Sequence, residues 1–245
     1  MSAISKILKN KRLAILAAAI ILLTAICFLF LKVQPLNNYQ KKIIMENEII
    51  LPHPQTKSPT SVEEAILKRR SVREYKDEPL SLGEVSQLLW AAQGITDFEK
   101  GFRTIPSAGA LYPLEIYVTG RIQGAAEGVY QYYPQNHSIV KIRDKDLREE
   151  LSEAAYSQKC VSQAPLNIIF TGVYERMAAK YGEEKAPRYT HLEAGHAAQN
   201  VYLQAQSLGL GTVTIGGFDI EKVAEALNLP DGEDPLYIMP VGKIR

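Results

Sequence analysis

Residues 189–208 read YTHLEAGHAAQNVYLQAQSL, and this stretch decides how the rest of the chain can fold. Its apolar positions recur at helical spacing and share one face. They are Leu192, Ala197, Val201, Ala205 and Leu208. Gly209 follows, and glycine often ends a helix because it tolerates the left-handed backbone conformation. The pattern predicts a long central helix against which other elements pack.

Strand candidates lie on both sides of this helix along the chain. LNIIFTGV (166–173) is apolar almost throughout, which predicts a strand buried on both faces. Shorter candidates are EIYVTG (115–120), VYQYY (129–133), SIVKIR (138–143), TVTIGGF (212–218) and LYIMPVGKIR (236–245).

Further helices are marked by their first residues. Ser61 with Glu64, and Ser81 with Glu84, have the spacing of capping boxes, and Gly94 ends the second helix. A helix is also expected over residues 146–160, and a short one after Asp219. Helices and strands do not alternate strictly, so the pattern predicts an α+β domain with one core.

Charge and cysteine content narrow the class of protein. The chain has 28 Lys and Arg against 27 Asp and Glu, so it lacks the general basic surface of a nucleic-acid-binding protein. Two cysteines are too few for a disulfide framework. Stability must therefore come from a packed core, and any local cluster of positive charge must serve a local anion.

The N-terminal part differs in composition from the rest. Residues 13–31 carry no charge over 19 positions, and at about 1.5 Å per residue such a helix nearly spans a bilayer core of roughly 30 Å. We therefore expect one transmembrane helix. A cleaved signal peptide is the alternative, but its apolar region would be shorter and would end in small residues.

The flanks of this span suggest a topology. Four basic residues precede it and three follow it, which favours a cytoplasmic N-terminus over residues 1–12 and an extracytoplasmic domain at the cell membrane. Residues 32–59 contain prolines and no steady period, which predicts a linker. The folded domain is then expected over residues 60–245.

Cations gather at both ends of the predicted domain. Arg69, Arg70 and Arg73 surround Ser71 where the first helix ends, and the closing GKIR places Lys243 and Arg245 on one side of an extended segment. A solvated helix end would explain the first cluster alone. Guanidinium groups, a hydroxyl and a second pair of cations are also the usual components of a phosphate site.

Five segments together resemble one family. KRRSVREY, PSAGALYP, LEAGHAAQN, GLGTVTIGGF and PVGKIR, in this order over residues 61–245, are similar to the FMN-dependent nitroreductases. Within that family they resemble most the azoline dehydrogenases, which form thiazoles and oxazoles in peptides. The resemblance implies a nitroreductase-like mixed or antiparallel sheet flanked by helices, a homodimer, and FMN at the dimer interface.

The resemblance also implies roles for individual residues. The phosphate and ribityl chain of FMN would be held by Arg69, Arg70, Ser71, Arg73, Lys243 and Arg245. A loop from the partner subunit would contribute Pro106, Ser107, Ala108 and Ala110. Gly216 and Gly217 would lie at the edge of the isoalloxazine ring, where glycine lets the backbone approach closely.

The implied chemistry is hydride transfer from NADH or NADPH, through FMN, to a small organic acceptor such as a nitroaromatic or a quinone. In azoline dehydrogenases a lysine and a tyrosine assist proton removal, and Lys180 with Tyr181 resembles that pair. An azoline-to-azole peptide dehydrogenase is therefore one alternative function. A flavin-binding module without catalytic activity is another.

Two other motifs do not support a site. GLGTVT lacks the third glycine of a dinucleotide fingerprint and is not followed by a helix. His191 and His196 are five positions apart, so they point about 140° apart around a helix and cannot share a metal ion. We expect no metal site, and we expect His196 to be a packed core residue.

Overall fold

The structure is a computed structural model that describes residues 47–245. Its main feature is a seven-stranded sheet in the order β1-β6-β5-β4-β7-β9-β8, in which every neighbouring pair within the described residues is antiparallel. The strands are β1 (Glu48–Ile50), β4 (Leu114–Gly120), β5 (Gly128–Tyr133), β6 (Ser138–Arg143), β7 (Leu166–Val173), β8 (Leu210–Thr212) and β9 (Glu233–Lys243). A separate hairpin joins β2 (Ile95–Asp97) to β3 (Phe102–Arg103).

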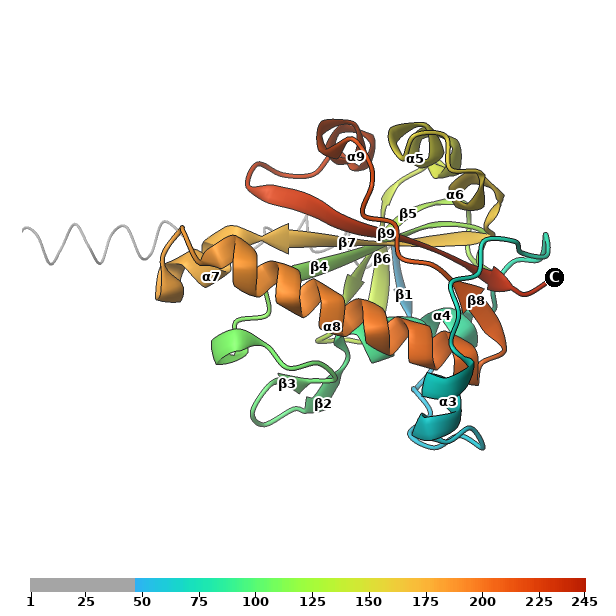
Figure 1. Ribbon diagram of the computed structural model, residues 1–245, viewed down its shortest axis with the longest axis horizontal. Helices are drawn as coiled ribbons and strands as arrows, with labels where there is room; N and C mark the ends of the chain where they lie inside the picture. The colour runs from blue at the N-terminus through green and yellow to red at the C-terminus, as the bar shows by residue number, and fades with distance from the viewer. Residues whose placement is uncertain (1–46) are drawn as a thin grey trace, which may run out of the picture. The chain divides into compact units, whose positions relative to one another are not determined.

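Helices cover both faces of this sheet (Figure 1). They are α3 (Val62–Lys68), α4 (Leu82–Gln93), η1 (Ala108–Ala110), α5 (Arg148–Ala154), α6 (Lys159–Gln163), α7 (Tyr174–Tyr181), α8 (Ala186–Ser207) and α9 (Ile220–Leu227). The long helix α8 and α4 lie on one face, and α5, α6 and α9 lie on the other. The predicted α+β class, with an antiparallel sheet flanked by helices, is confirmed.

The sheet separates two hydrophobic cores, and the central strand β7 contributes side chains to both. Its side chains alternate, so that Ile168 and Phe170 join the core under α4 and α8, while Ile169 joins the core under α5, α6 and α9. All three are fully buried. The continuous apolar run that predicted a strand buried on both faces therefore has this direct structural cause.

Helix starts follow the predicted caps. Ser81 and Glu84 form both halves of a capping box at α4, since the Ser81 amide donates to the Glu84 carboxylate and the Glu84 amide donates to Ser81 Oγ. At α3, the Ser61 hydroxyl accepts from the Glu64 amide and caps the first turn. The central helix begins earlier than expected, at Ala186.

Two predicted elements differ from the structure. The helix expected over 146–160 is broken into α5 and α6. Between them, Tyr156 and Ser157 adopt the left-handed conformation, with φ angles of 56° and 60°. The strand expected over 212–218 ends at Thr212, and beyond it Ile215 alone bridges to β9, at Ile238.

The linker prediction also differs at its C-terminal end. Glu48–Ile50 pairs with β6 as an edge strand, and Leu51 is buried in the core. The amide of Gln55 donates to the Gln87 side chain on α4. Residues 47–59 therefore belong to the folded domain, whereas residues 1–46 lie outside the described part of the chain.

Candidate functional site

The first and last predicted motifs lie side by side at one edge of the sheet. Ser71 forms a parallel bridge with Thr212 on β8, and Tyr75 forms an antiparallel bridge with Ile244, just beyond β9. The Lys76 amide donates to the Lys243 carbonyl at 2.8 Å. Residues 71–76 are thus held by backbone hydrogen bonds against two strands that come from the other end of the chain.

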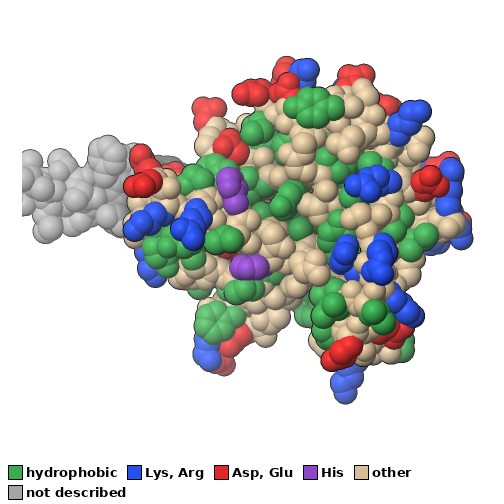
Figure 2. Space-filling model, in the orientation of Figure 1, with side chains coloured by type: hydrophobic (Ala, Val, Ile, Leu, Met, Phe, Trp, Pro, Cys, Tyr) green, Lys and Arg blue, Asp and Glu red, His purple; other side chains and the backbone are tan. Residues whose placement is uncertain are grey.

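This arrangement brings the two segments that carry the predicted cations to one edge of the sheet. The cations are Arg69, Arg70, Arg73, Lys243 and Arg245. Figure 2 shows Lys and Arg side chains on the face of the molecule above α3 and beside the C-terminus. Lys243 is already paired, since its Nζ lies 2.7 Å from Glu78 Oε2, and this hydrogen bond raises the pKa of Lys243.

The four arginines of this group lack a carboxylate partner among residues 47–245. Arg70 donates instead to the carbonyls of Leu67 and Arg69, and Arg245 Nε donates to the Tyr75 carbonyl at 3.0 Å. Their positive charge is therefore not neutralised by the described part of the protein. Such a cluster can bind an anion.

A cavity of about 200 Å³ lies beside the arginines. Its lining includes Arg69, Arg70, Tyr202, Thr212 and Ile244. The Arg69 guanidinium lies 5.0 Å from the centre of the Tyr202 ring, and the Tyr202 hydroxyl contacts Ser71 Oγ at 3.2 Å. Tyr202 is a site residue that the sequence analysis missed, because it looks like an ordinary position on the central helix.

Gly216 and Gly217 follow β8 and expose their backbone. A side chain at Gly216 would lie 3.3 Å from the Tyr237 ring, whereas nothing lies within 4 Å of a side chain built at Gly217. The Gly217 carbonyl accepts from Gln158 Nε2 at 3.4 Å. The pair forms an open stretch of backbone that a flat ligand can approach.

The loop of residues 106–110 lies elsewhere in the chain, next to α7. Ser107 Oγ accepts a hydrogen bond from the Tyr112 amide at 2.9 Å. Gly109 has a φ of 63°, and a side chain built there would lie 2.7 Å from Lys180 Nζ and 2.9 Å from the Tyr181 hydroxyl. The structure thus brings Lys180 and Tyr181 together with this loop.

The predicted site residues therefore form two groups along α8. The arginine group contacts the helix at Tyr202, and the 106–110 loop contacts it near Glu193. These positions are nine residues apart, which corresponds to roughly 13 Å along a helix. In Figure 1 the loop lies toward α7, whereas α3, β8 and the C-terminus lie toward the other end of α8.

Glu193 is a second residue that the sequence analysis missed. Its side chain is 2% exposed, its Oε1 accepts from Gln93 Nε2 at 3.3 Å, and its Oε2 lacks a hydrogen-bond partner within the described structure. Burial raises the pKa of Glu193 to about 7, although the nearby Ser107 and Gln93 side chains oppose this rise. The signal in the sequence is an acidic residue on the apolar face of the central helix.

The prediction for His196 is wrong. His196 is exposed, because the face of α8 that packs on the sheet carries Ala194, Ala197 and Val201 instead. His191 is exposed as well, and its Nε2 lies 2.9 Å from the Tyr174 hydroxyl. Neither histidine contributes to the core.

Comparison with known proteins identifies similar sequences. The sequence profile of the Nitroreductase family matches residues 66–243. A Methanocaldococcus jannaschii protein named as a nitroreductase is 51% identical over 183 residues, covering 74% of this chain and 90% of that protein. The FMN reductase (NADPH) of Bacillus subtilis is 27% identical over 192 residues, covering 73% of this chain but 64% of that protein, slightly less than two thirds.

Solved structures show the same fold. A crystal structure from Ralstonia eutropha, described as a nitroreductase, superposes with a TM-score of 0.73 at 31% identity, covering 81% of this chain and 90% of that one. A chain of the Escherichia coli microcin synthetase complex McbBCD superposes with a TM-score of 0.61 at 22% identity, covering 86% of this chain and 83% of that one. At that identity the second match shows a shared fold alone.

The predicted localisation at the cell membrane, with the domain on the extracytoplasmic side, is wrong. The M. jannaschii protein aligns over 90% of its length, which leaves only about a tenth of it for any other segment. Over residues 47–245, no helix is both long enough and apolar enough to cross a membrane. The stretch predicted as a transmembrane helix, residues 13–31, lies outside the described residues.

Proposed function

Because the chain belongs to the nitroreductase family, we propose that it uses FMN to transfer a hydride from NADH or NADPH to a small organic acceptor. Enzymes of this family use FMN, and two of the relatives are named FMN reductase (NADPH) and NADPH-dependent oxidoreductase. The observation that carries the proposal is the convergence of both cationic motifs beside β8 and β9.

The phosphate of FMN suits the cationic edge. We assign it to Arg69, Ser71, Arg73 and Arg245, with Arg70 alongside, because a phosphate dianion would neutralise guanidinium groups that lack a carboxylate in the described residues. Lys243 contributes less, since Glu78 already compensates its charge. Tyr202 adds a hydroxyl and an aromatic face beside the same cavity.

The ring of FMN suits the open backbone at Gly216 and Gly217. Bound FMN supplies the hydride-carrying ring, and the protein supplies orientation and electrostatics. Two adjacent glycines allow the backbone to approach a flat ring, and their amides can donate hydrogen bonds to its polar edge. We assign no further step to the ring.

A homodimer would complete the site. We propose that Pro106, Ser107, Ala108 and Ala110 reach the FMN of the partner subunit, since in one chain they contact a different part of α8 from the arginines. Helix α3 supports an interface, because Val62, Ile66 and Leu67 are each more than half exposed. Large apolar side chains gathered on one short helix favour contact with another protein surface.

A second candidate function is the oxidation of azolines to azoles in peptides. The observation that favours it is the position of Lys180 and Tyr181 against the 106–110 loop. A lysine there could remove the proton that a substrate azoline ring must lose, if bound FMN supplied the hydride acceptor. Loss of azoline oxidation in Lys180→Ala with unchanged flavin content would support this candidate, and unchanged turnover would remove it.

Flavin titration tests the main proposal. Arg73→Gln should weaken FMN binding about tenfold or more, because a charge-assisted contact to phosphate contributes roughly 1.5–3 kcal/mol. Lys222→Gln, on the exposed side of α9, removes one positive charge elsewhere and should leave binding unchanged. A wild-type protein that takes up no FMN would contradict the proposal.

Anaerobic stopped-flow measurements separate an enzyme from a silent flavin-binding module. The wild-type protein loaded with FMN should be bleached by NADPH or NADH and should recover its colour when a quinone or nitroaromatic is added. A protein that holds FMN but is neither reduced nor reoxidised would be a binding module instead.

A further inference from the structure

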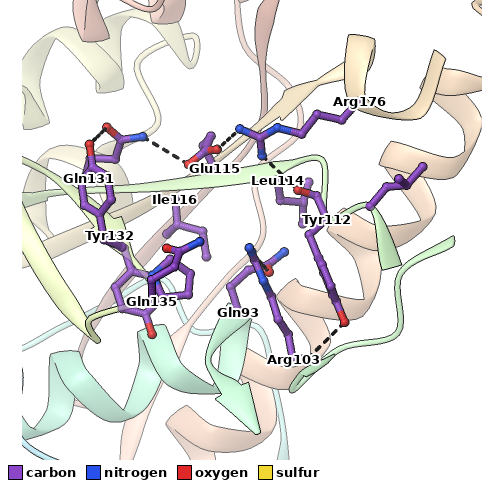
Figure 3. Close-up of a pocket in the computed structure, with 13 residues that line it drawn as sticks. Gln93, Arg103, Tyr112, Leu114, Glu115, Ile116, Gln131, Tyr132, Gln135 and Arg176 are labelled. Carbon is purple, nitrogen blue, oxygen red and sulfur yellow. Dashed lines mark hydrogen bonds and ion pairs between the residues drawn. The ribbon is translucent and has the colours of Figure 1, made fainter. Parts of the chain in front are cut away.

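A second cavity lies under the loop that follows η1, away from the arginine group. It has a volume of about 370 Å³, within the range of about 300–1,000 Å³ of small-molecule sites. The end of α4, strands β3, β4 and β5, and helix α7 all contribute to its walls. Figure 3 shows that Arg103 lies at this pocket between Gln93 and Tyr112. We call it the Arg103 pocket.

Arg103 is held rigidly but has no carboxylate partner in the described structure. Its Nη1 donates to Gln93 Oε1 at 2.6 Å, and its guanidinium lies 4.4 Å from the centre of the Tyr112 ring. The Arg103 amide donates to the Tyr112 hydroxyl at 3.1 Å. These contacts fix a partly buried cation in place, and burial lowers the pKa of Arg103.

The other charges on the pocket wall compensate one another. Arg176 is paired with Glu115, and Arg176 Nη1 also donates to the Tyr112 carbonyl at 3.0 Å. The second oxygen of Glu115 accepts from Gln131 Nε2 at 3.2 Å. With Arg176 and Glu115 cancelling, the charged residues that line the pocket leave one net positive charge, on Arg103.

The remaining walls are suited to an apolar or aromatic body. They include Leu111, Leu114, Ile116, Tyr132 and Tyr133. We propose that the Arg103 pocket binds a small organic carboxylate, whose anionic group contacts the Arg103 guanidinium and whose apolar body packs on these residues. A guanidinium suits a carboxylate because its fork of donors matches the two oxygens. None of the residues assigned to FMN lines this pocket, so the proposal does not depend on FMN binding.

The pocket is connected to Glu193 through one amide. Gln93 accepts from Arg103 with its oxygen and donates to Glu193 with its nitrogen. The groups that act on the Glu193 carboxyl are Ser107, Gln93, Arg103 and Arg176, and its pKa is about 7. Above pH 7 Glu193 is ionised and offsets the charge of Arg103, so a carboxylate should bind more tightly at pH 6 than at pH 8.

Calorimetric titration of the full-length, FMN-loaded protein with benzoate tests this proposal, with benzamide as the neutral analogue of the same shape. We expect one benzoate per chain at pH 6 and about tenfold or more weaker binding of benzamide. Arg103→Gln should weaken benzoate binding by about the same factor, since it keeps a side chain of similar length without the charge. Lys100→Gln, on the same hairpin but outside the pocket, should bind benzoate as the wild type does.

Glu193→Gln provides a second test, which measures how the affinity for benzoate depends on pH in a variant that still binds benzoate. In the wild-type protein, affinity for benzoate should fall about threefold or more between pH 6 and pH 8, and in this variant it should stay constant. Equal affinities for benzoate and benzamide, no measurable benzoate binding, or unchanged binding in Arg103→Gln would each overturn the proposal.

One more variant separates this site from the flavin. Benzoate affinity should be unchanged in Arg73→Gln with lowered FMN occupancy. If benzoate binding disappears together with FMN, the carboxylate binds at the flavin, the Arg103 pocket is refuted as its site, and the proposed flavin function stands.

Discussion

Replacing Glu193 with glutamine should flatten the dependence of the protein's stability on pH. Glu193 is 2% exposed, and its pKa rises from 4.5 to about 7 in the folded state. The folded protein therefore keeps this proton between about pH 4.5 and 7, whereas the unfolded chain loses it. The raised pKa stabilises the protonated folded state below this window, and that stability is lost as the pH rises through 7.

The size of the effect follows from the shift. At about 1.4 kcal/mol for each pKa unit, the change from 4.5 to about 7 corresponds to roughly 3 kcal/mol of unfolding free energy between pH 4.5 and pH 8. The glutamine also places a donor where Glu193 Oε2 has no partner within the described residues, which costs about 1–3 kcal/mol. That cost is the same at both pH values, so it cancels when the two slopes are compared.

Urea denaturation at pH 5 and pH 8, at equal flavin occupancy, measures this difference. Between pH 5 and pH 8, the unfolding free energy of the wild-type protein should fall by about 2–3 kcal/mol more than that of Glu193→Gln. Glu127→Gln, in an exposed loop, controls for the loss of a carboxylate and should keep the wild-type slope. Equal slopes in wild type and Glu193→Gln would show that this carboxyl is solvated or paired in solution, and would refute the reasoning.

Three further substitutions test the scaffold. Ser81→Ala removes one half of the capping box at α4 and should lower the unfolding free energy by about 1 kcal/mol in urea denaturation. Phe170→Ala empties the centre of a core and should cost about 3–5 kcal/mol, seen as a large fall in the melting temperature. Gly109→Ala should cost about 1–2 kcal/mol, because φ is 63° there, and should speed chemical labelling of Lys180, whose Nζ would lie 2.7 Å from the new methyl group.

The sequence predicted the elements whose formation depends on residues close together in the chain. The run at 166–173, the cap at Ser81 and the cap at Asp219 all appear in the structure as expected. The broken helix at Tyr156 and Ser157 could not be predicted, because non-glycine residues rarely adopt left-handed backbone angles. Strand β1 was not predicted, because its three residues follow a linker-like stretch and are too few to show a periodic pattern of apolar residues.

The two candidate sites also differ in how far the sequence predicted them. The cationic motifs are visible as clusters in the sequence, but their contact with each other depends on Ser71 pairing with β8 and Tyr75 pairing beyond β9. The Arg103 pocket left no local signal at all. Gln93, Arg103 and Glu193 come from three separate segments, and Gln93 on α4 joins them through its hydrogen bonds to Arg103 on β3 and Glu193 on α8.

Helix α8 connects these regions, and this has a consequence for the proposed dimer. Tyr202 contacts the arginine group of its own chain, while Glu193 lies by the loop that we assign to the partner subunit's FMN. Each α8 would then support two flavins, one through Tyr202 and one through Ser107. A change in the protonation of Glu193 would then act beside the loop assigned to the partner subunit's FMN, as well as on the Arg103 pocket of its own chain.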